Sequence, residues 1–171
     1  MSEARYGRDF IKHELDEAIS MQNVMVETAR TLADAHPEPA ARRLIKGMVR
    51  DDERQLRELE QLGTQYGASG KVEDVAEVLR DLARATTESA SEAESEAYEA
   101  HAVLLALKRK QQDSAGAVLK IARAIRDTEM RDAARTMLRE TKAAAQALAD
   151  SLADFAVVIA TREPAGAPSK A

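Results

Sequence analysis

Cysteine and tryptophan are absent from this sequence, and other aromatic residues are few. The 171 residues include three Tyr and two Phe. Without Cys the chain has no disulfide, no thiolate metal ligand and no cysteine nucleophile. The core must therefore be built mainly from Ala, Leu, Val, Ile and six Met residues.

Glycine and proline are also scarce, with seven and four copies, and most of them gather in a few places. Between those places Ala, Glu, Arg and Leu dominate, which favours helix over strand. A chain of this length with 44% hydrophobic residues can form one domain with a sizeable core. The composition predicts an all-α protein.

Neither a large charge of one sign nor a long apolar run is present. The formal net charge is −5 with both signs interspersed, which argues against a nucleic-acid surface. The start, MSEARYGRDF, lacks the basic and then apolar order of a signal peptide. The run from Phe155 to Ala160 is far too short to span a bilayer. We expect a cytoplasmic protein that binds neither nucleic acid nor membrane.

Breaks in the apolar pattern divide the chain into four long helices and a shorter one. The first break is His36-Pro37-Glu38-Pro39, because proline removes a backbone donor and disfavours helix in the residue before it. Such a short loop predicts an antiparallel second helix. Further breaks are expected at 67–70, around 85–87 and at 113–116. The predicted helices cover residues 5–35, 40–66, 71–85, 88–112 and 117–162, which make up a 1–162 bundle followed by a disordered 163–171 tail.

Each long helix carries polar side chains on the face that its apolar spacing directs at the core. On the second helix, Asp52 and Gln55 occupy core positions between Met48 and Leu59. A buried carboxylate is costly unless it is paired, hydrogen-bonded or bound to a cation. The candidate metal ligands are Gln22, Asp52, Gln55, Glu94, Glu129 and Asp132, with His101 at the edge.

The spacing of these residues is typical of a carboxylate-bridged metal site. Such a site in a bundle takes a Glu from two helices and a Glu-x-x-His pair from the other two. The i, i+3 spacing directs both side chains of a pair to one face. It is present in Asp52-x-x-Gln55 and in Glu129-x-x-Asp132, but neither pair contains His.

The segment from Ala18 to Leu62 resembles the first two helices of the ferritin-like superfamily, in particular its YciF-type stress proteins. The segment SEAESEAYEAHAVLLALK resembles the third helix of that family. The resemblance implies a ferritin-like four-helix bundle with an additional helix in the crossover from Gly63 to about Glu88 and a long last helix. It also implies that Gln22 stands where the family has Glu, and Gln55 where it has His.

These two departures predict a degenerate metal site. An amide is a weak ligand for iron or manganese, and the imidazoles that usually complete the site are missing. The acids that remain would form an all-oxygen cluster. Alternatively, the polar residues form a hydrogen-bonded network with no metal.

Two functions are compatible with these residues. In the first, the bundle lacks a competent di-iron centre and a cofactor, and acts through assembly or partner binding in a stress-related role. We then expect a homo-oligomer that associates through the apolar face from Ala144 to Ile159. In the second, the oxygen cluster binds iron or manganese for storage or oxidation. No nucleophile–base arrangement or phosphate loop is evident, which argues against other enzymes.

Overall fold

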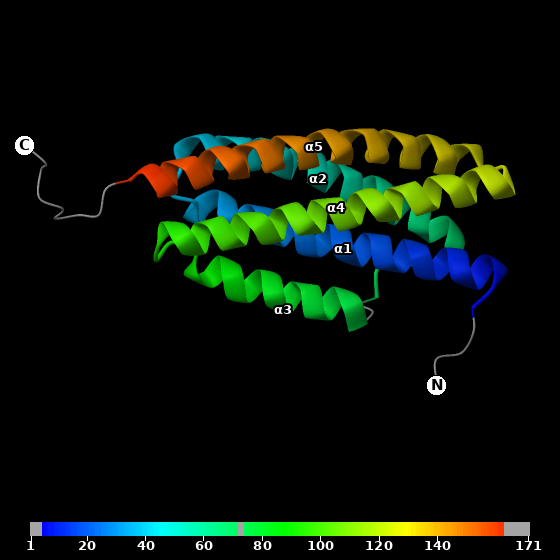
Figure 1. Cartoon of the computed structure of the whole chain (residues 1–171). Helices are drawn as coiled ribbons and strands as arrows, with labels where there is room; N and C mark the ends of the chain where they lie inside the picture. Colours follow the sequence, from blue (N-terminus) through cyan, green and yellow to red (C-terminus); the bar gives the residue numbers. More distant parts are fainter. Residues whose placement is uncertain (1–4, 72–73, 163–171) are drawn as a thin grey trace, which may run out of the picture.

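The chain folds into five α-helices, and the residues described by the structure contain no strand (Figure 1). The structure is a computed structural model that describes residues 5–71 and 74–162. The helices are α1 (Gly7–Ala35), α2 (Pro39–Tyr66), α3 (Asp74–Ser89), α4 (Glu94–Ile125) and α5 (Thr128–Thr161). The predicted disordered tail, 163–171, lies outside the described residues.

Four of these helices form the bundle, and α3 lies outside it against α1 and α4. In Figure 1, α1 runs antiparallel to α2, and α4 antiparallel to α5. The crossover through α3 returns the chain to the end of the bundle at which α1 ends and α2 starts. Helix α4 therefore starts at that end and runs parallel to α2. This confirms the predicted all-α bundle with an additional crossover helix and a long last helix.

The turn between α1 and α2 follows the proline prediction. Pro39 is the first residue of α2, where its missing N–H costs nothing. The Glu38 side chain caps the helix by accepting a hydrogen bond from the backbone N–H of Ala40 at 3.2 Å. At the other end of α2, Gly67 adopts the left-handed conformation, with φ of 75°.

The predicted helix breaks around 85–87 and at 113–116 are wrong, because α3 continues through the first and α4 through the second. Gly116 lies inside the helix, where glycine costs only about 1 kcal/mol relative to Ala. Packing of the buried Val118 and Ala122 against the core outweighs that cost. The turn comes instead at Arg126, with φ of 59°, and at Asp127, which accepts a hydrogen bond from the Met130 N–H at 2.9 Å.

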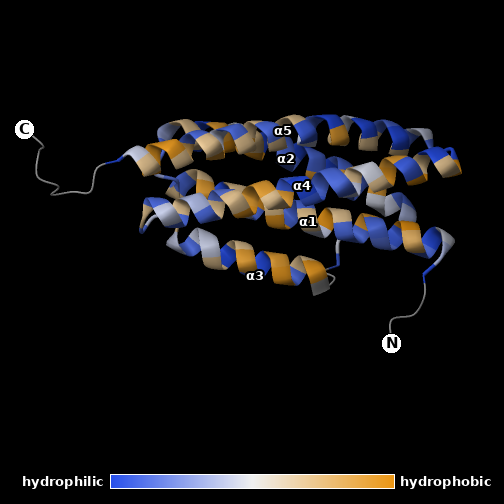
Figure 2. Cartoon of the chain, in the orientation of Figure 1, coloured by the Kyte–Doolittle hydropathy of each residue, from blue (hydrophilic) through white to orange (hydrophobic). Residues whose placement is uncertain are grey.

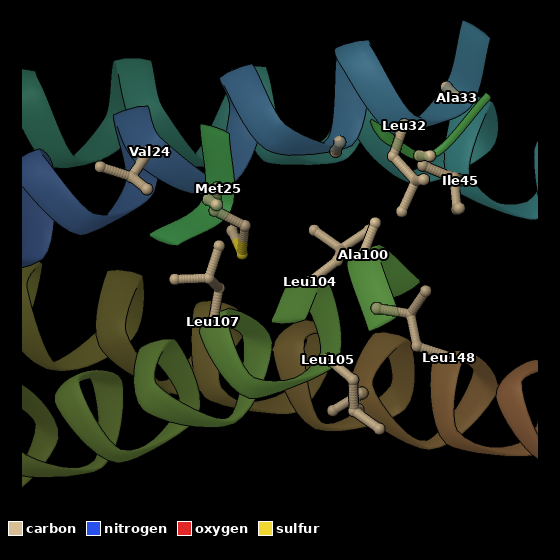
Figure 3. Packing of buried hydrophobic residues seen from close by; sticks show 14 of the residues in the cluster. Val24, Met25, Leu32, Ala33, Ile45, Ala100, Leu104, Leu105, Leu107 and Leu148 are labelled. Atoms are coloured by element: carbon tan, nitrogen blue, oxygen red, sulfur yellow. The ribbon is translucent and has the colours of Figure 1, made fainter. Parts of the chain in front are cut away.

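The core consists of two apolar clusters at the two ends of the bundle. In one of them, Met25 and Leu32 of α1 lie near Leu104 and Leu107 of α4 (Figure 3). The other is formed by residues nearer the start of α1, the end of α4 and the start of α5. In the sequence of each bundle helix, the residues of the two clusters are separated by buried polar side chains.

By length and composition alone, α5 also qualifies as a candidate membrane span. Core helices of soluble proteins pass the same test, so this property is a weak indication. Within the apolar face predicted for self-association, Ala145, Leu148 and Phe155 are buried in the chain's own core. Much of that face therefore stabilises the bundle itself.

Candidate functional site

A layer of buried polar side chains crosses the middle of the bundle, between the two apolar clusters. Each of the four bundle helices contributes to it through positions at helical spacing on its inner face. The buried members are Gln22 of α1, Asp52 and Gln55 of α2, Lys108 and Gln111 of α4, and Thr141 of α5. The predicted burial of Gln22, Asp52 and Gln55 is confirmed.

A buried ion pair lies in this layer. The ammonium group of Lys108 donates a hydrogen bond to Oδ1 of Asp52, and both side chains are 2% exposed. The backbones of α2 and α4 lie diagonally across the bundle and do not approach each other closely, so the long lysine side chain spans the distance between the two helices. Burial raises the pKa of Asp52 and lowers that of Lys108, while the attraction between the two charges opposes both shifts.

The sequence interpretation missed Lys108. With the third long helix ended at residue 112, Lys108 fell in a last turn where basic residues are common. The signal that would have identified it is the apolar row through His101 and Leu104. Continued at steps of four and three, this row reaches Lys108 and Gln111, both buried in the structure.

The amide groups of the layer donate hydrogen bonds to neighbouring helices. Gln22 Nε2 donates to the backbone carbonyl of Asp52 at 2.9 Å. Gln55 Nε2 donates to Oε2 of Glu140 at 2.9 Å, and the same oxygen accepts a hydrogen bond from Arg54 at 2.8 Å. These bonds lower the pKa of Glu140 against the opposing effect of its partial burial. The amides therefore link α1 to α2 and α2 to α5.

Several buried oxygens in the layer accept no hydrogen bond from any described residue. They are Gln22 Oε1, Asp52 Oδ2, Gln55 Oε1, Gln111 Oε1 and Thr141 Oγ1. Unpaired buried acceptors are uncommon because each one loses its bonds to water. This layer is therefore the part of the interior with the greatest unused capacity to bind a donor or a cation.

The layer does not fit the metal pair that the ferritin-like resemblance implies. Asp52 is its one fully buried carboxylate, and one oxygen of Asp52 is already bonded to a cationic side chain. Glu140 is half-buried and bonded to Arg54 and Gln55. No imidazole belongs to the layer, because His101 lies two helical turns before Lys108 on α4. A carboxylate-bridged metal pair needs more anionic ligands than this.

The other three predicted ligands lie away from Asp52, and their predicted convergence with it is wrong. Glu94 is in the first turn of α4 and pairs with Arg162 at the end of α5. Glu129 and Asp132 are exposed at the start of α5. The misplaced helix break contributed to the error, because α4 continues to Ile125 and α5 begins only at Thr128, so that Glu94, Glu129 and Asp132 lie at the ends of these helices and not near their centres.

One group of three potential metal ligands does lie close together among the described residues, near the start of α1. Atoms of His13, Glu14 and Glu17 lie within 4.8 Å of one another. Glu17 pairs with Lys110 at 2.6 Å, and His13 contacts Arg5 at 2.5 Å. This half-buried group is part of a surface charge network.

A second buried polar pair lies towards the end of the bundle at which α1 ends and α4 begins. His36 Nε2 and His101 Nδ1 are 3.2 Å apart, and both side chains are fully buried. The His36 ring also packs on Phe155 of α5, with 4.8 Å between ring centroids. Burial lowers the pKa of both groups, and the neighbouring His36 helps to lower that of His101 to about 4. Both rings are therefore neutral at pH 7. His101, which was predicted to lie at the edge of a metal site, therefore contacts another histidine.

The fold and its interior define the class of the protein: a four-helix bundle with a polar central layer and a fifth helix in the crossover. No protein-family model matches the chain, and no curated protein matches it. Among solved structures, it is similar to the crystal structure of the E. coli stress protein YciF, with a TM-score of 0.75. That similarity covers 86% of this chain and 95% of the YciF chain at 17% sequence identity. At this identity it establishes a shared fold.

Proposed function

We propose that this protein is a ferritin-like bundle without a competent di-iron centre, which acts through assembly or partner binding in a stress-related role. The fold shared with the stress protein YciF supports the bundle class and motivates the stress-related role. The central layer, in which Asp52 already binds the ammonium group of Lys108, supports the absence of a di-iron centre. We retain the expectations of a cytoplasmic location, of a homo-oligomer, and of no nucleic-acid or membrane partner.

The observation that carries this proposal is the ammonium group of Lys108 on Asp52. A ferritin-like metal site needs a cation at the centre of the bundle to neutralise the inward carboxylates. Here the ammonium group of Lys108, a cation covalently attached to the chain, has that role, and the single carboxylate of Asp52 is enough to balance its charge. A divalent ion would have to displace the ammonium group and leave it buried without a partner, which is strongly unfavourable.

The unpaired oxygens favour a second candidate function. If Lys108 moved away from Asp52, the free oxygens of Gln22, Gln55 and Asp52 would offer an all-oxygen set suited to a hard divalent cation such as manganese. The protein would then store or oxidise metal. This alternative needs a second conformation of Lys108.

Metal content distinguishes the two functions. The purified protein is loaded separately with iron, manganese and zinc, passed through a desalting column and analysed by mass spectrometry, with a ferrous-oxidation assay alongside. Asp52→Ala is the test variant, and Asp132→Ala, at an exposed acid, is its control. We expect well below one equivalent of metal in all three proteins. Stoichiometric metal that is lost in Asp52→Ala and kept in Asp132→Ala would overturn the proposal.

A further inference from the structure

The two buried histidines at the end of the bundle belong to a chain of hydrogen bonds with one direction. The backbone N–H of Glu38 donates to His36 Nδ1 at 3.1 Å, so the neutral His36 ring carries its proton on Nε2. That N–H faces His101 Nδ1 at 3.2 Å, and the His101 proton is therefore also on Nε2. Nε2 of His101 has no hydrogen-bond acceptor at normal geometry among the described residues, and the backbone of Leu148 is the polar group that acts on this ring.

This chain of hydrogen bonds has no place for a further proton. A proton added to His36 must bind Nδ1, which the Glu38 N–H already faces. A proton added to His101 must also bind Nδ1, and two N–H groups would then face each other. In both cases a hydrogen bond is lost and a charge is buried, because both side chains are 0% exposed. Protonation is therefore incompatible with the observed packing of the two rings.

The charged groups around His36 do not compensate for such a proton. Burial lowers the pKa of His36 most, and the charged groups that act on it, Glu38 and Arg42, have opposite effects. The guanidinium group of Arg42 donates to the backbone carbonyl of His36 at 2.7 Å, so a positive charge is already fixed beside the turn. Protonated His36 would thus gain one attraction and one repulsion.

The elements packed on the other side of the pair bring no compensating charge. Burial lowers the pKa of His101 most, and the titratable group that adds to this effect is His36 itself. From α5, the ring of Phe155 covers His36 with 4.8 Å between ring centroids. Asp150 and Asp154 line a surface groove beside Phe155, but both are exposed and neither contributes to the shift of either histidine.

The helix ends around the pair bury mainly small side chains. Besides Leu32 and Phe155, the buried apolar residues there are Ala33 of α1, Ala41 of α2, and Ala97 and Ala100 of α4. Alanine removes little apolar surface from water, so these contacts stabilise the packing less than the Leu and Met side chains nearer the centre. This end can therefore open at a lower free energy than the whole bundle.

We propose that the His36–His101 contact is a pH-sensitive switch, and that protonation of its rings separates the turn between α1 and α2 from α4 and α5 while the rest of the bundle stays folded. This inference rests on the proposed stress-related role and deepens it, since it names acidification as the condition to which the bundle responds. Opening uncovers the Phe155 ring, which is 1% exposed, and the apolar run that follows it, coloured as hydrophobic near the end of α5 in Figure 2. Such a surface is suited to assembly or partner binding.

The test is amide hydrogen exchange of the full chain at pH 7 and pH 5, measured by mass spectrometry and corrected for the pH dependence of chemical exchange. The pKa of His101 is about 4 in the packed ring, against 6.5 in an opened one, which makes opening about twentyfold more frequent at pH 5 than at pH 7. His36 adds to this factor. We expect the increase in peptides that cover residues 33–42 and 95–105, and not in peptides of the central layer.

Three variants assign the response to the pair. The double variant His36→Gln/His101→Gln has no titrating ring at this end, so its exchange should be the same at both pH values, whatever its level. His101→Gln should retain only the contribution of His36. The matched control is His13→Gln, which changes the third histidine of the chain, near the start of α1, and should respond as wild type does.

The direction of the hydrogen-bond chain can be tested without any variant. Nitrogen chemical shifts of the imidazole rings, measured by NMR at pH 7, should show that His36 and His101 both carry the proton on Nε2. A proton on Nδ1 of either ring would contradict the proposed switch.

Three exchange results would overturn the inference. They are equal opening of wild type at pH 7 and pH 5, an increase that persists in the double variant, and an increase centred on the peptides around Asp52, whose pKa is raised by burial. None of them bears on metal content, so the proposed function would stand without an acid response. Stoichiometric metal in a protein whose end opens in acid would overturn the proposed function alone.

Discussion

The bundle contains two buried polar pairs, and the cost of burying their polar groups is offset in a different way in each pair. At the centre, Asp52 and Lys108 carry opposite charges and compensate each other. Near the end of the bundle at which α1 ends and α4 begins, His36 and His101 form a neutral contact between two imidazole nitrogens. The charged pair depends on the presence of both partners, whereas the histidine pair depends on both rings remaining unprotonated. The comparison shows that burial alone does not determine the chemistry of a polar layer.

The largest expected effect comes from removing one partner of the charged pair. Lys108→Met leaves Asp52 buried without a counter-charge, and should lower the free energy of unfolding by about 3–5 kcal/mol in urea denaturation at pH 7. The matched control is Lys110→Met, which removes a half-exposed partner of Glu17 and should cost at most about 1 kcal/mol. Equal losses in the two variants would mean that burial of the central pair has no special energetic importance.

The histidine pair should make the free energy of unfolding decrease as the pH becomes acidic. The pKa of His101 is lowered to about 4 from an ordinary value of 6.5, so between these values the unfolded chain binds more protons than the folded one. Stability is then fully present above pH 6.5 and falls as the pH drops towards 4, by about 3 kcal/mol for this group. The lowered pKa of His36 acts in the same direction.

The measurement is the free energy of unfolding in urea at several pH values between 7 and 4, for wild type and for His101→Gln. Other acids titrate in both proteins, so the difference between their slopes isolates His101. The slope should be smaller in the variant. Parallel curves would show that His101 does not resist protonation in the folded state.

Asp16 is a buried acid that binds backbone groups, and its removal should have an intermediate effect. Its Oδ1 accepts hydrogen bonds from the N–H groups of Ser69 and Gly70 at 2.7 and 2.9 Å, and these hold the chain where it leaves α2 for α3. Asp16→Ala should lower the free energy of unfolding by about 2 kcal/mol. Asp9→Ala, at an exposed position in the first turn of the same helix, is the control and should have little effect.

The smallest effects are expected at the predicted ligands that lie away from the central layer. Glu129→Ala and Asp132→Ala remove exposed side chains and should leave the free energy of unfolding close to that of wild type. A change as large as that of Lys108→Met would indicate that these acids share in the central layer after all.

The sequence predicted the first half of the bundle well. Periodicity identified the inner faces of α1 and α2, and on them the buried Gln22, Asp52 and Gln55. Periodicity failed in the second half because it identifies which face of a helix is buried more reliably than it identifies where the helix ends. Gly116 resembles a break, yet tertiary packing carries α4 through it.

The partners of the buried groups were beyond the reach of the sequence. Lys108 pairs with Asp52 across the bundle although the two residues are 56 positions apart in the sequence, and no local pattern encodes that pairing. His36 lies in a proline loop, where an exposed side chain is the ordinary expectation, and it is buried because α4 and α5 both pack against it. Both pairs arise from the packing of distant segments.

The central claim is that Lys108 supplies the charge that Asp52 requires inside the bundle. A double-mutant cycle in urea denaturation, with Asp52→Leu, Lys108→Met and the two combined, tests it most directly. We predict that each single change costs about 3–5 kcal/mol and that the double variant, with an apolar pair in the layer, loses far less than either. Losses that simply add in the double variant would contradict the claim.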